Sequence, residues 1–444
     1  MNRRLILLLG LSSGLFFSAC TPRITQQPGT SSVRPPGGDD TQRPVLVAGE
    51  EPEIRILLVR SVSAFKLSSH KTVDILGPGG RRLVKLKAKN TYHFFQDPKK
   101  PGELKIYESI HDGRSLRETG APIPLASGTW IVPRSASFEL NGKRYRGRLR
   151  ILLTGNHFNC VNYLPIEEYL RGVVPHEIGH LGKSGFEALK VQAVASRTYA
   201  IQRLRDSRDK PWDMVDSIAD QVYRGGGSWS LADKAIRATR GELVAIGREP
   251  AEIYYSSTCG GYTADISRVW NHGVAPHLAG VRDADSRGHS WCRSSKYFRW
   301  THSWSAKELG SILRAYLPSA AGLPSGTKLG HLKDLRILEY SPEGRVQVLE
   351  VLTDQGRFKV TGDRIRSALK RDMKGRPLRS IMFRLNKEYD SGGRLIRISA
   401  VGAGWGHGIG LCQVGAIERS KAGEDYRRIL KAYFPTTGIR KFWP

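Results

Sequence analysis

The sequence has few long apolar runs and few acidic side chains, and each shortage narrows what the chain can be. Only the stretch from Leu5 to Phe17 is predominantly apolar, and it is shorter than the roughly 20 residues that a membrane-spanning helix requires. Asp and Glu number 41 against 70 Lys and Arg, so the formal net charge is +29. We therefore expect no spanning helix, and we expect partners that carry negative charge.

The first residues have the three parts of a secretory signal. A basic start precedes the apolar run, and the small pair Ser18-Ala19 stands directly before Cys20. This order is typical of a lipoprotein box, so residues 1–19 are expected to be removed and the Cys20 thiol to be acylated. Phe17 stands where such a box usually has leucine, and plain secretion is the alternative.

The next segment, residues 20–52, is rich in Pro, Gly, Ser, Thr and Gln, which predicts a flexible tether. Thr21 stands where aspartate would signal retention in the inner membrane. The outer membrane facing the periplasm is therefore favoured if the cell is Gram-negative. Losing Arg3 and Arg4 with the signal lowers the charge only from +29 to +27. An exported chain meets anionic envelope polymers and no nucleic acid; a basic surface that only maintains solubility is the alternative.

The patterning predicts an α+β fold. Short alternating runs at 54–60, 129–132 and 143–153, separated by turn residues, predict strands, and a run of apolar residues from Phe186 to about Arg205 predicts a long, central helix. A shorter helix is expected to start near Leu164 and to end before Pro175. The predicted parts are the signal 1–19, the tether 20–52, a β-rich part 53–160, a catalytic core 161–299, a mixed helix and strand insertion 300–397, and a C-terminal part 398–444 with a Gly-rich strand and a helix.

Besides Cys20 the chain has four cysteines, Cys160, Cys259, Cys292 and Cys412. Cys160 lies in an alternating strand pattern, where a buried free thiol that packs as a small apolar group is expected. Cys259 and Cys292 lie in Gly/Ser-rich segments that are predicted loops. In an oxidising envelope these two can form a disulfide.

Glu177 is the first candidate for chemistry. It follows Pro175 and stands among glycines, in a predicted loop between two helices where a ligand can approach. Its other interpretation is a cap for the next helix. That helix carries Gln192, Ser196 and Arg197 among apolar residues, and buried polar groups require partners. Gln192 and Ser196 are expected on the same face of the helix. Arg197 is expected to pair with a carboxylate near Glu177 or to fix a loop backbone.

Two further clusters are rich in glycine and in side chains that suit sugars. The segment 254–262 combines tyrosines, hydroxyls and a Gly-Gly turn. The segment 402–410 has glycine at every second position, so an extended backbone would present one bare face and another with Trp405 and His407. A flat sugar ring could lie on the bare face. Polar strand ends and close backbone packing are the respective alternatives.

Together these motifs resemble the stage II sporulation protein D family, in the same order along most of the chain from about Ile54. The resemblance implies a lytic transglycosylase that cuts peptidoglycan glycan strands stripped of their stem peptides, or an enhancer of a cell-wall amidase. Glu177 matches the family's catalytic glutamate, and the positions matching its cleft are Gln192, Arg197, Tyr255, Ser257, Thr258, Trp405, His407 and Gln413. The motifs that carry the resemblance are 161–177, 188–200, 256–261 and 404–416.

The implied reaction requires a single acid. A neutral Glu177 would protonate the oxygen between N-acetylmuramic acid and N-acetylglucosamine, and its carboxylate would then take the proton of the sugar's own 6-hydroxyl, which closes a 1,6-anhydro ring. Glu167, Glu168 and Glu187 are expected on helix surfaces, so no second acid stands beside Glu177. A hydrolase would require one. A basic structural lipoprotein would leave the motifs unexplained.

The resemblance also raises the question of zinc. Some members bind it through cysteine and histidine near the Ser-Thr-Cys-Gly-Gly motif, and Cys259, His289 and Cys292 are the matching candidates here. Ser256 stands where many members have histidine, so a Cys259–Cys292 disulfide is the alternative to a metal site. The reaction itself requires no cofactor. The expected partners are glycan strands, a cell-wall amidase and the membrane that holds the lipid anchor.

Overall fold

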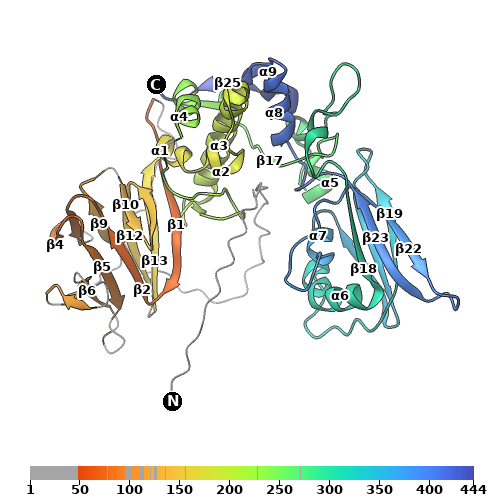
Figure 1. Cartoon of the computed structure of the whole chain (residues 1–444), viewed down its shortest axis with the longest axis horizontal. Helices are drawn as coiled ribbons and strands as arrows, with labels where there is room; N and C mark the ends of the chain where they lie inside the picture. The colour runs from red at the N-terminus through yellow and green to blue at the C-terminus, as the bar shows by residue number, and fades with distance from the viewer. Residues whose placement is uncertain are drawn as a thin grey trace.

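The computed structural model describes residues 49–444, apart from 78, 97–99, 101, 110–114, 121, 125–127, 136, 156, 228 and 271. The expected signal, Cys20 and all but the end of the tether lie outside the described residues. Two β-rich lobes stand on either side of a helical centre, one in orange and yellow and the other in cyan and blue (Figure 1). The fold is α+β, as the patterning predicts.

The N-terminal lobe consists of two sheets that share one core. Phe158 of the first sheet meets Phe65 of the second edge-on, with ring centroids 5.7 Å apart. Their strand orders are β14-β1-β13-β12-β9-β3-β4 and β11-β10-β2-β5-β6-β7, with β8 on β6. The strands are β1 Glu53–Val62, β2 Ala64–Ser68, β3 Val73–Leu76, β4 Arg82–Leu86, β5 Thr91–Gln96, β6 Glu103–Ser109, β7 Leu116–Glu118, β8 Ile123–Pro124, β9 Thr129–Pro133, β10 Ser137–Leu140, β11 Lys143–Arg146, β12 Arg148–Thr154, β13 His157–Pro165 and β14 Met214–Val215.

Gly147 divides what the sequence presents as one strand over 143–153. Its φ is +82°, and a Cβ atom there would lie 2.2 Å from the Tyr163 carbonyl oxygen. Only glycine fits so close to another backbone at a positive φ. The chain therefore leaves the second sheet after β11 and enters the first as β12.

The helical centre surrounds α3, Phe186–Asp206, which confirms the predicted long helix. The short helix predicted before it is two helices, because Gly172 ends α1 and Pro175 lies in the first turn of α2. Glu177 is consequently the last residue of a one-turn helix and lies outside any loop. The elements of the centre are α1 Ile166–Arg171, α2 Val174–Glu177, α4 Ser230–Ala238, α5 Ile266–Trp270, α8 Gln413–Lys421, α9 Tyr426–Tyr433, and the strands β15 Glu242–Ile246, β16 Glu249–Pro250, β17 Tyr255–Ser256, β24 Leu411–Cys412 and β25 Gly438–Lys441; short 3₁₀ turns cover Lys183–Gly185, Pro276–Leu278 and Trp291–Ser294.

The second lobe has two three-stranded sheets with helix α6 beside them. The sequence predicts a helix first, but strand β18 precedes it, and Ser305 caps α6 by accepting a hydrogen bond from the Glu308 amide. Strand β23 runs through residue 397, where the sequence placed the end of the insertion. The elements are β18 Trp300–Ser305, α6 Ala306–Ala321, β19 Leu332–Tyr340, β20 Val346–Thr353, β21 Gly356–Thr361, α7 Arg364–Ala368, β22 Phe383–Tyr389 and β23 Leu395–Gly402.

The Gly-rich segment after β23 is not the extended ribbon that its alternating glycines suggest. Gly404, Gly406, Gly408 and Gly410 all have positive φ, between 68° and 109°. The segment is therefore a series of tight bends without a flat bare face. The helix expected after it is two helices, α8 and α9.

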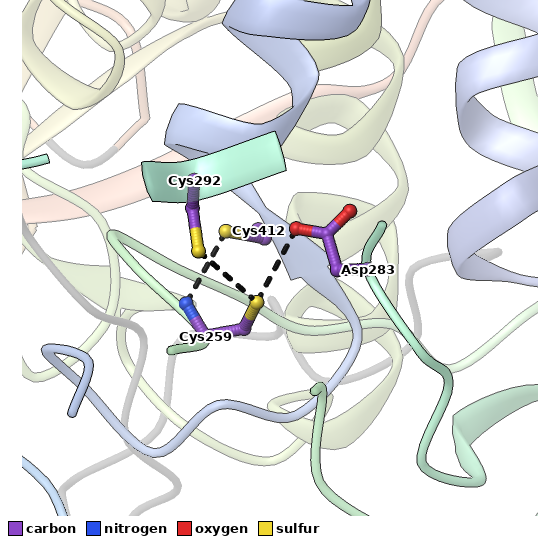
Figure 2. Close-up of side chains that lie close together, drawn as sticks. All are labelled: Cys259, Asp283, Cys292 and Cys412. Atoms are coloured by element: carbon purple, nitrogen blue, oxygen red, sulfur yellow. Dashed lines mark hydrogen bonds between the residues drawn. The ribbon is translucent and has the colours of Figure 1, made fainter. Parts of the chain in front are cut away.

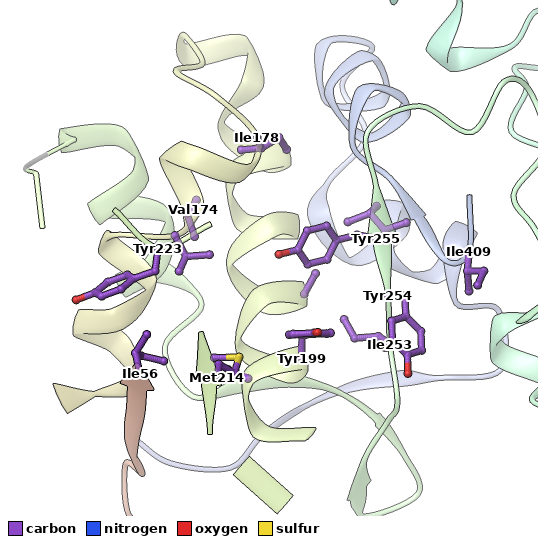
Figure 3. Close-up of a cluster of buried hydrophobic side chains, with 14 of the residues drawn as sticks. Ile56, Val174, Ile178, Tyr199, Met214, Tyr223, Ile253, Tyr254, Tyr255 and Ile409 are labelled. Carbon is purple, nitrogen blue, oxygen red and sulfur yellow. The ribbon is translucent and has the colours of Figure 1, made fainter. Parts of the chain in front are cut away.

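One apolar core runs through the centre and into both lobes. Part of it is drawn in Figure 3, where Tyr223 and Val174 lie on one side of α3 and Tyr254 and Ile409 on the other. Cys160 is fully buried in β13, and burial raises the pKa of its thiol far above the usual value, as expected for a packed free cysteine. Among the described helices, none is both long and apolar enough to cross a membrane.

Candidate active site

Glu177 lies at the end of α2 with its carboxylate completely enclosed. Oε1 accepts a hydrogen bond of 2.7 Å from the Val222 amide, and Oε2 lies 3.5 Å from the Gln413 side-chain nitrogen. The Tyr255 hydroxyl is its third partner. The carboxylate is thus held by two segments that precede the insertion, around Val222 and Tyr255, and by one that follows it, at Gln413.

Burial raises the pKa of Glu177 to about 7. The hydrogen bonds from Val222, Gln413 and Tyr255 favour the charged form and limit this rise. None of the groups that shift this pKa is a second carboxylate. At neutral pH Glu177 can therefore either hold or release a proton, which is what a group acting in turn as acid and base requires.

A chain of polar groups supports the Tyr255 hydroxyl from behind. The Gln221 side-chain nitrogen donates to it at 2.9 Å, and Gln221 in turn accepts from the Tyr169 hydroxyl at 3.0 Å. Because its oxygen already accepts from Gln221, the Tyr255 proton is directed elsewhere, toward Glu177. The chain therefore fixes the orientation of this donor.

Gln413 is the second side chain that reaches Glu177, and Gln192 holds it. The Gln413 amide nitrogen donates to the Glu177 carbonyl at 3.1 Å and to the Gln192 side-chain oxygen at 3.2 Å. Gln192 donates to Ser196 at 2.9 Å, so the predicted shared face of Gln192 and Ser196 is confirmed. In this structure Gln192 is buried behind Gln413 and orients it.

Arg197 does not join this group. It is fully buried and forms two hydrogen bonds to Glu167, at 2.9 and 2.8 Å, and one of 3.0 Å to the Glu242 carbonyl. Glu167 was expected on the helix surface, and that expectation is wrong because the carboxylate is needed inside to neutralise Arg197. Glu168 and Glu187 are both partly exposed, as expected, and pair with the partly buried Arg171 and Lys190 of their own helices.

The other predicted cleft residues, Ser257, Thr258, Trp405 and His407, form no hydrogen bond with the Glu177 carboxylate. Ser257 and Thr258 are buried, and Thr258 bonds the Ser295 hydroxyl at 2.9 Å. His407 is fully buried, accepts from the Ile409 amide and donates to the Tyr255 carbonyl, and burial lowers its pKa to about 3. It is therefore a neutral structural group. Trp405 alone is half-exposed.

A separate cluster joins Cys259, Asp283, Cys292 and Cys412 (Figure 2). One donor atom from each lies within 4.8 Å of all the others, and all four residues are buried. The Cys259 and Cys292 sulfurs are 3.6 Å apart, close to the edge of about 3.8 Å that a tetrahedral zinc with bonds near 2.3 Å would give. Three thiols and one carboxylate are a donor set that suits zinc.

Hydrogen-bond donors around this cluster contact its sulfur and carboxylate atoms. The amides of Gly261 and Gly415 donate to the Cys259 and Cys412 sulfurs, each at 3.4 Å. Asp283 is oriented by the Tyr433 hydroxyl at 2.8 Å, and burial raises its pKa to about 6. Such outer contacts are typical of groups that ligate a metal.

Two expectations for this cluster are corrected. His289 does not belong to it, since its ring is mostly exposed and lies against Asp285. Cys259 and Cys292 are free thiols at 3.6 Å and not a disulfide. The sequence missed Asp283 and Cys412 as donors, and it missed Val222 and Gln221 beside Glu177. Neither Val222 nor Asp283 stands in a spacing that indicates such a role.

Comparisons with known proteins show which family this chain resembles. An uncharacterized protein of Brachyspira hyodysenteriae is 31% identical over 305 residues, which cover 67% of this chain and 72% of that protein. Stage II sporulation protein D of Bacillus subtilis is 28% identical over 298 residues, covering 63% and 75%. The family model of the stage II sporulation protein matches residues 154–245, which contain Glu177. The chain belongs to the stage II sporulation protein D family.

Two further matches concern the remaining parts of the chain. The amidase enhancer of Bacillus subtilis is 27% identical over 299 residues, which are 62% of this chain but only 40% of that protein. Residues 285–410 match a domain of unknown function. This second match contains the whole second lobe, together with Cys292, Trp405 and His407.

Proposed function

We propose that this chain is a peptidoglycan lytic transglycosylase that cuts between N-acetylmuramic acid and N-acetylglucosamine and leaves 1,6-anhydro ends. Membership of the family supports a role in the cell wall. The single observation that carries the enzymatic proposal is Glu177, a buried carboxyl group with a pKa of about 7 and no carboxylate partner among the residues that the structure describes.

Glu177 performs both proton transfers. In its neutral form it gives its proton to the bridging oxygen, and the bond from that oxygen to the muramic anomeric carbon breaks. The resulting carboxylate accepts the proton of the muramic 6-hydroxyl as that oxygen bonds to the anomeric carbon, so Glu177 ends as it began and no water is consumed. Tyr255 and Gln413 stabilise the carboxylate between the two steps by donating hydrogen bonds to it.

A glycan strand reaches Glu177 only after part of its cover moves. The Val222 amide occupies Oε1, and Val222 precedes the glycines 225–227. Trp229 follows them, and its ring is tilted by 34° against the His180 ring, with the ring centroids 3.5 Å apart. We propose that displacement of this segment exposes the acid, because glycines let a backbone change direction at little cost.

The complete burial of Glu177 favours a second candidate function. A carboxyl group that only caps the Val222 amide would be buried in the same way, and the chain would then be a non-catalytic glycan-binding enhancer of a cell-wall amidase. The amidase enhancer among the relatives supports this alternative.

We also propose that Cys259, Asp283, Cys292 and Cys412 hold a structural zinc ion. With four protein donors the metal would act as a cross-link and take no part in the reaction. Cys412 directly precedes Gln413, so a fixed Cys412 helps to hold Gln413 against Glu177.

The two candidate functions are separated by incubating the full-length protein with amidase-treated glycan strands and analysing the ends by mass spectrometry. Anhydro ends produced by the wild type and absent with Glu177→Gln support the transglycosylase. Strands that both proteins bind and neither cuts would favour the enhancer, and new reducing ends would indicate a hydrolase.

A further inference from the structure

Two aromatic and two basic side chains of the domain of unknown function gather beside the Gly-rich segment. The Trp405 and Tyr297 rings meet edge-on with centroids 3.8 Å apart. The Arg371 guanidinium carbon lies 5.9 Å from the Trp405 ring centre, and that of Arg379 lies 6.0 Å from the Tyr297 ring centre. We call these four residues the Trp405 cluster.

Within the described part of the chain, neither guanidinium group forms an ion pair with an acid, although the charge of the adjacent Asp372 acts on Arg371. Arg379 forms no ion pair there, and its Nε and Nη1 atoms are buried without a hydrogen-bond acceptor. Arg371 donates only to the Pro377 carbonyl. Asp372 is already paired with Arg376. Burial lowers the pKa of Arg371, and the charges of Arg379 and Arg376 lower it further against the opposing effect of Asp372. The cluster therefore holds uncompensated positive charge next to apolar rings.

Backbone hydrogen bonds connect the cluster to the proposed active site. The amides of Gly404 and Gly406 donate to the carbonyls of Tyr297 and Arg379, at 2.9 and 2.8 Å. Trp405 and Thr258 exchange two backbone hydrogen bonds, at 2.8 and 3.2 Å. Thr258 follows Tyr255, the donor to Glu177, by three residues. A ligand bound at Trp405 would therefore contact a residue that is hydrogen-bonded to the same segment that carries Tyr255.

We propose that the Trp405 cluster binds a carboxylate-bearing sugar, with Trp405 packing against the ring and Arg371 and Arg379 taking the carboxylate. The apolar C–H face of a pyranose packs well on an aromatic ring. A guanidinium group presents a planar pair of donors that matches a carboxylate and binds it more strongly than a neutral amide. The inference rests on the proposed function, since it identifies the sugar as a muramic acid of the strand.

This site would make the protein prefer strands without stem peptides. The lactyl group of muramic acid ends in a free carboxylate once the peptide is removed, whereas with the peptide attached that carboxylate is an amide and uncharged. An uncharged amide can accept a hydrogen bond from the two guanidinium groups, but it cannot neutralise their positive charge. The positive charge of the cluster therefore distinguishes the two kinds of strand.

Binding is measured in the Glu177→Gln background, so that no strand is cut, with amidase-treated strands and with the same strands after chemical conversion of their carboxylates to amides. We expect Arg371→Gln and Arg379→Gln each to weaken binding of the charged strands about tenfold and to leave the amidated strands unaffected. Trp405→Ala should weaken both equally. Arg357→Gln, on the exposed face of β21, removes the same charge elsewhere and is the matched control.

Equal losses on both kinds of strand, or an equal loss in the Arg357 control, would overturn the site. Free muramic acid should compete for the cluster and inorganic phosphate should not; competition by phosphate alone would identify a phosphate site instead. Melting temperatures check folding, and Arg371→Lys, which keeps the charge, should retain part of the preference. If the arginine variants lose the preference and the wild type also fails to cut strands in a parallel assay, the site is supported and only the proposed enzymatic activity is refuted.

Discussion

At the scale of the residue, Glu177 combines three requirements of a proton-transferring group in one position. It has burial that favours its neutral form, donors that favour its charged form, and no acid among the described residues that shifts its pKa. The pKa of about 7 results from the opposed effects of burial and of the donors. The motif could indicate Glu177 from the sequence although the predicted loop is a helix, but the pKa depends on Val222 and Tyr255, which lie far away along the chain.

The raised pKa of Glu177 predicts a specific pH dependence of stability. Below pH 4.5 the group is protonated in both the folded and the unfolded chain. As pH rises toward 7 only the unfolded chain loses the proton, so the folded state loses about 3 kcal/mol relative to Glu177→Gln across this window. Urea unfolding of both proteins between pH 4 and 8 measures this difference. Parallel stability profiles for the two proteins would contradict it.

At the scale of the element, the contact of α1 with α3 depends on one buried ion pair. Glu167 accepts from Arg197, from the Gly241 amide and from the Trp443 indole. Glu167→Gln leaves Arg197 buried without a counter-charge, and we expect a loss of roughly 3 to 5 kcal/mol in the free energy of unfolding. Glu168→Gln, on the same helix and partly exposed, should cost about 0 to 1 kcal/mol. Denaturant unfolding measures both, and similar losses would argue against the buried pair.

The cysteine cluster joins four separate segments of the chain, namely two loops, the 3₁₀ turn Trp291–Ser294 and β24, and its metal content is directly measurable. We expect the full-length protein to bind zinc in a ratio of about one to one. Cys292→Ser should lose the metal and melt at lower temperature, whereas Cys160→Ser, a buried cysteine in β13, should keep it. Elemental analysis and thermal melting provide the readouts. A metal-free protein with a Cys259–Cys292 cross-link would show that the alternative is correct.

The elements show what the sequence could and could not provide. Alternating patterns predicted strands at 54–60 and 129–132, because burial of one face of a strand repeats every second residue. A long apolar run predicted α3, which is buried on nearly all sides. The predicted single strand over 143–153 failed at Gly147, where contact with a distant backbone decides the conformation. The Gly-rich segment failed for a related reason, since alternating glycines fit both an extended strand and a series of positive-φ bends. Asp283 could not be found because its partners meet it only in the fold.

At the scale of the whole molecule, the net charge of +29 and the lipoprotein box both bear on where in the cell the protein resides. We propose that it is exported and anchored through Cys20, which lies outside the described residues. Cys20→Ser should move the protein out of the detergent phase but leave it bound to isolated cell walls at low salt. At about 1 M salt, where charges are screened beyond about 3 Å, it should be released. Retention of Cys20→Ser in the detergent phase would refute the anchor.

The measurement that tests the central claim most directly is cleavage of amidase-treated strands in heavy-oxygen water. The account predicts that wild type and Glu168→Gln produce anhydro-muramic ends without heavy oxygen, because the 6-hydroxyl and not water attacks the anomeric carbon, and that Glu177→Gln produces none. Reducing ends that carry heavy oxygen, or anhydro ends formed equally by Glu177→Gln, would contradict Glu177 as the single acid of a transglycosylase.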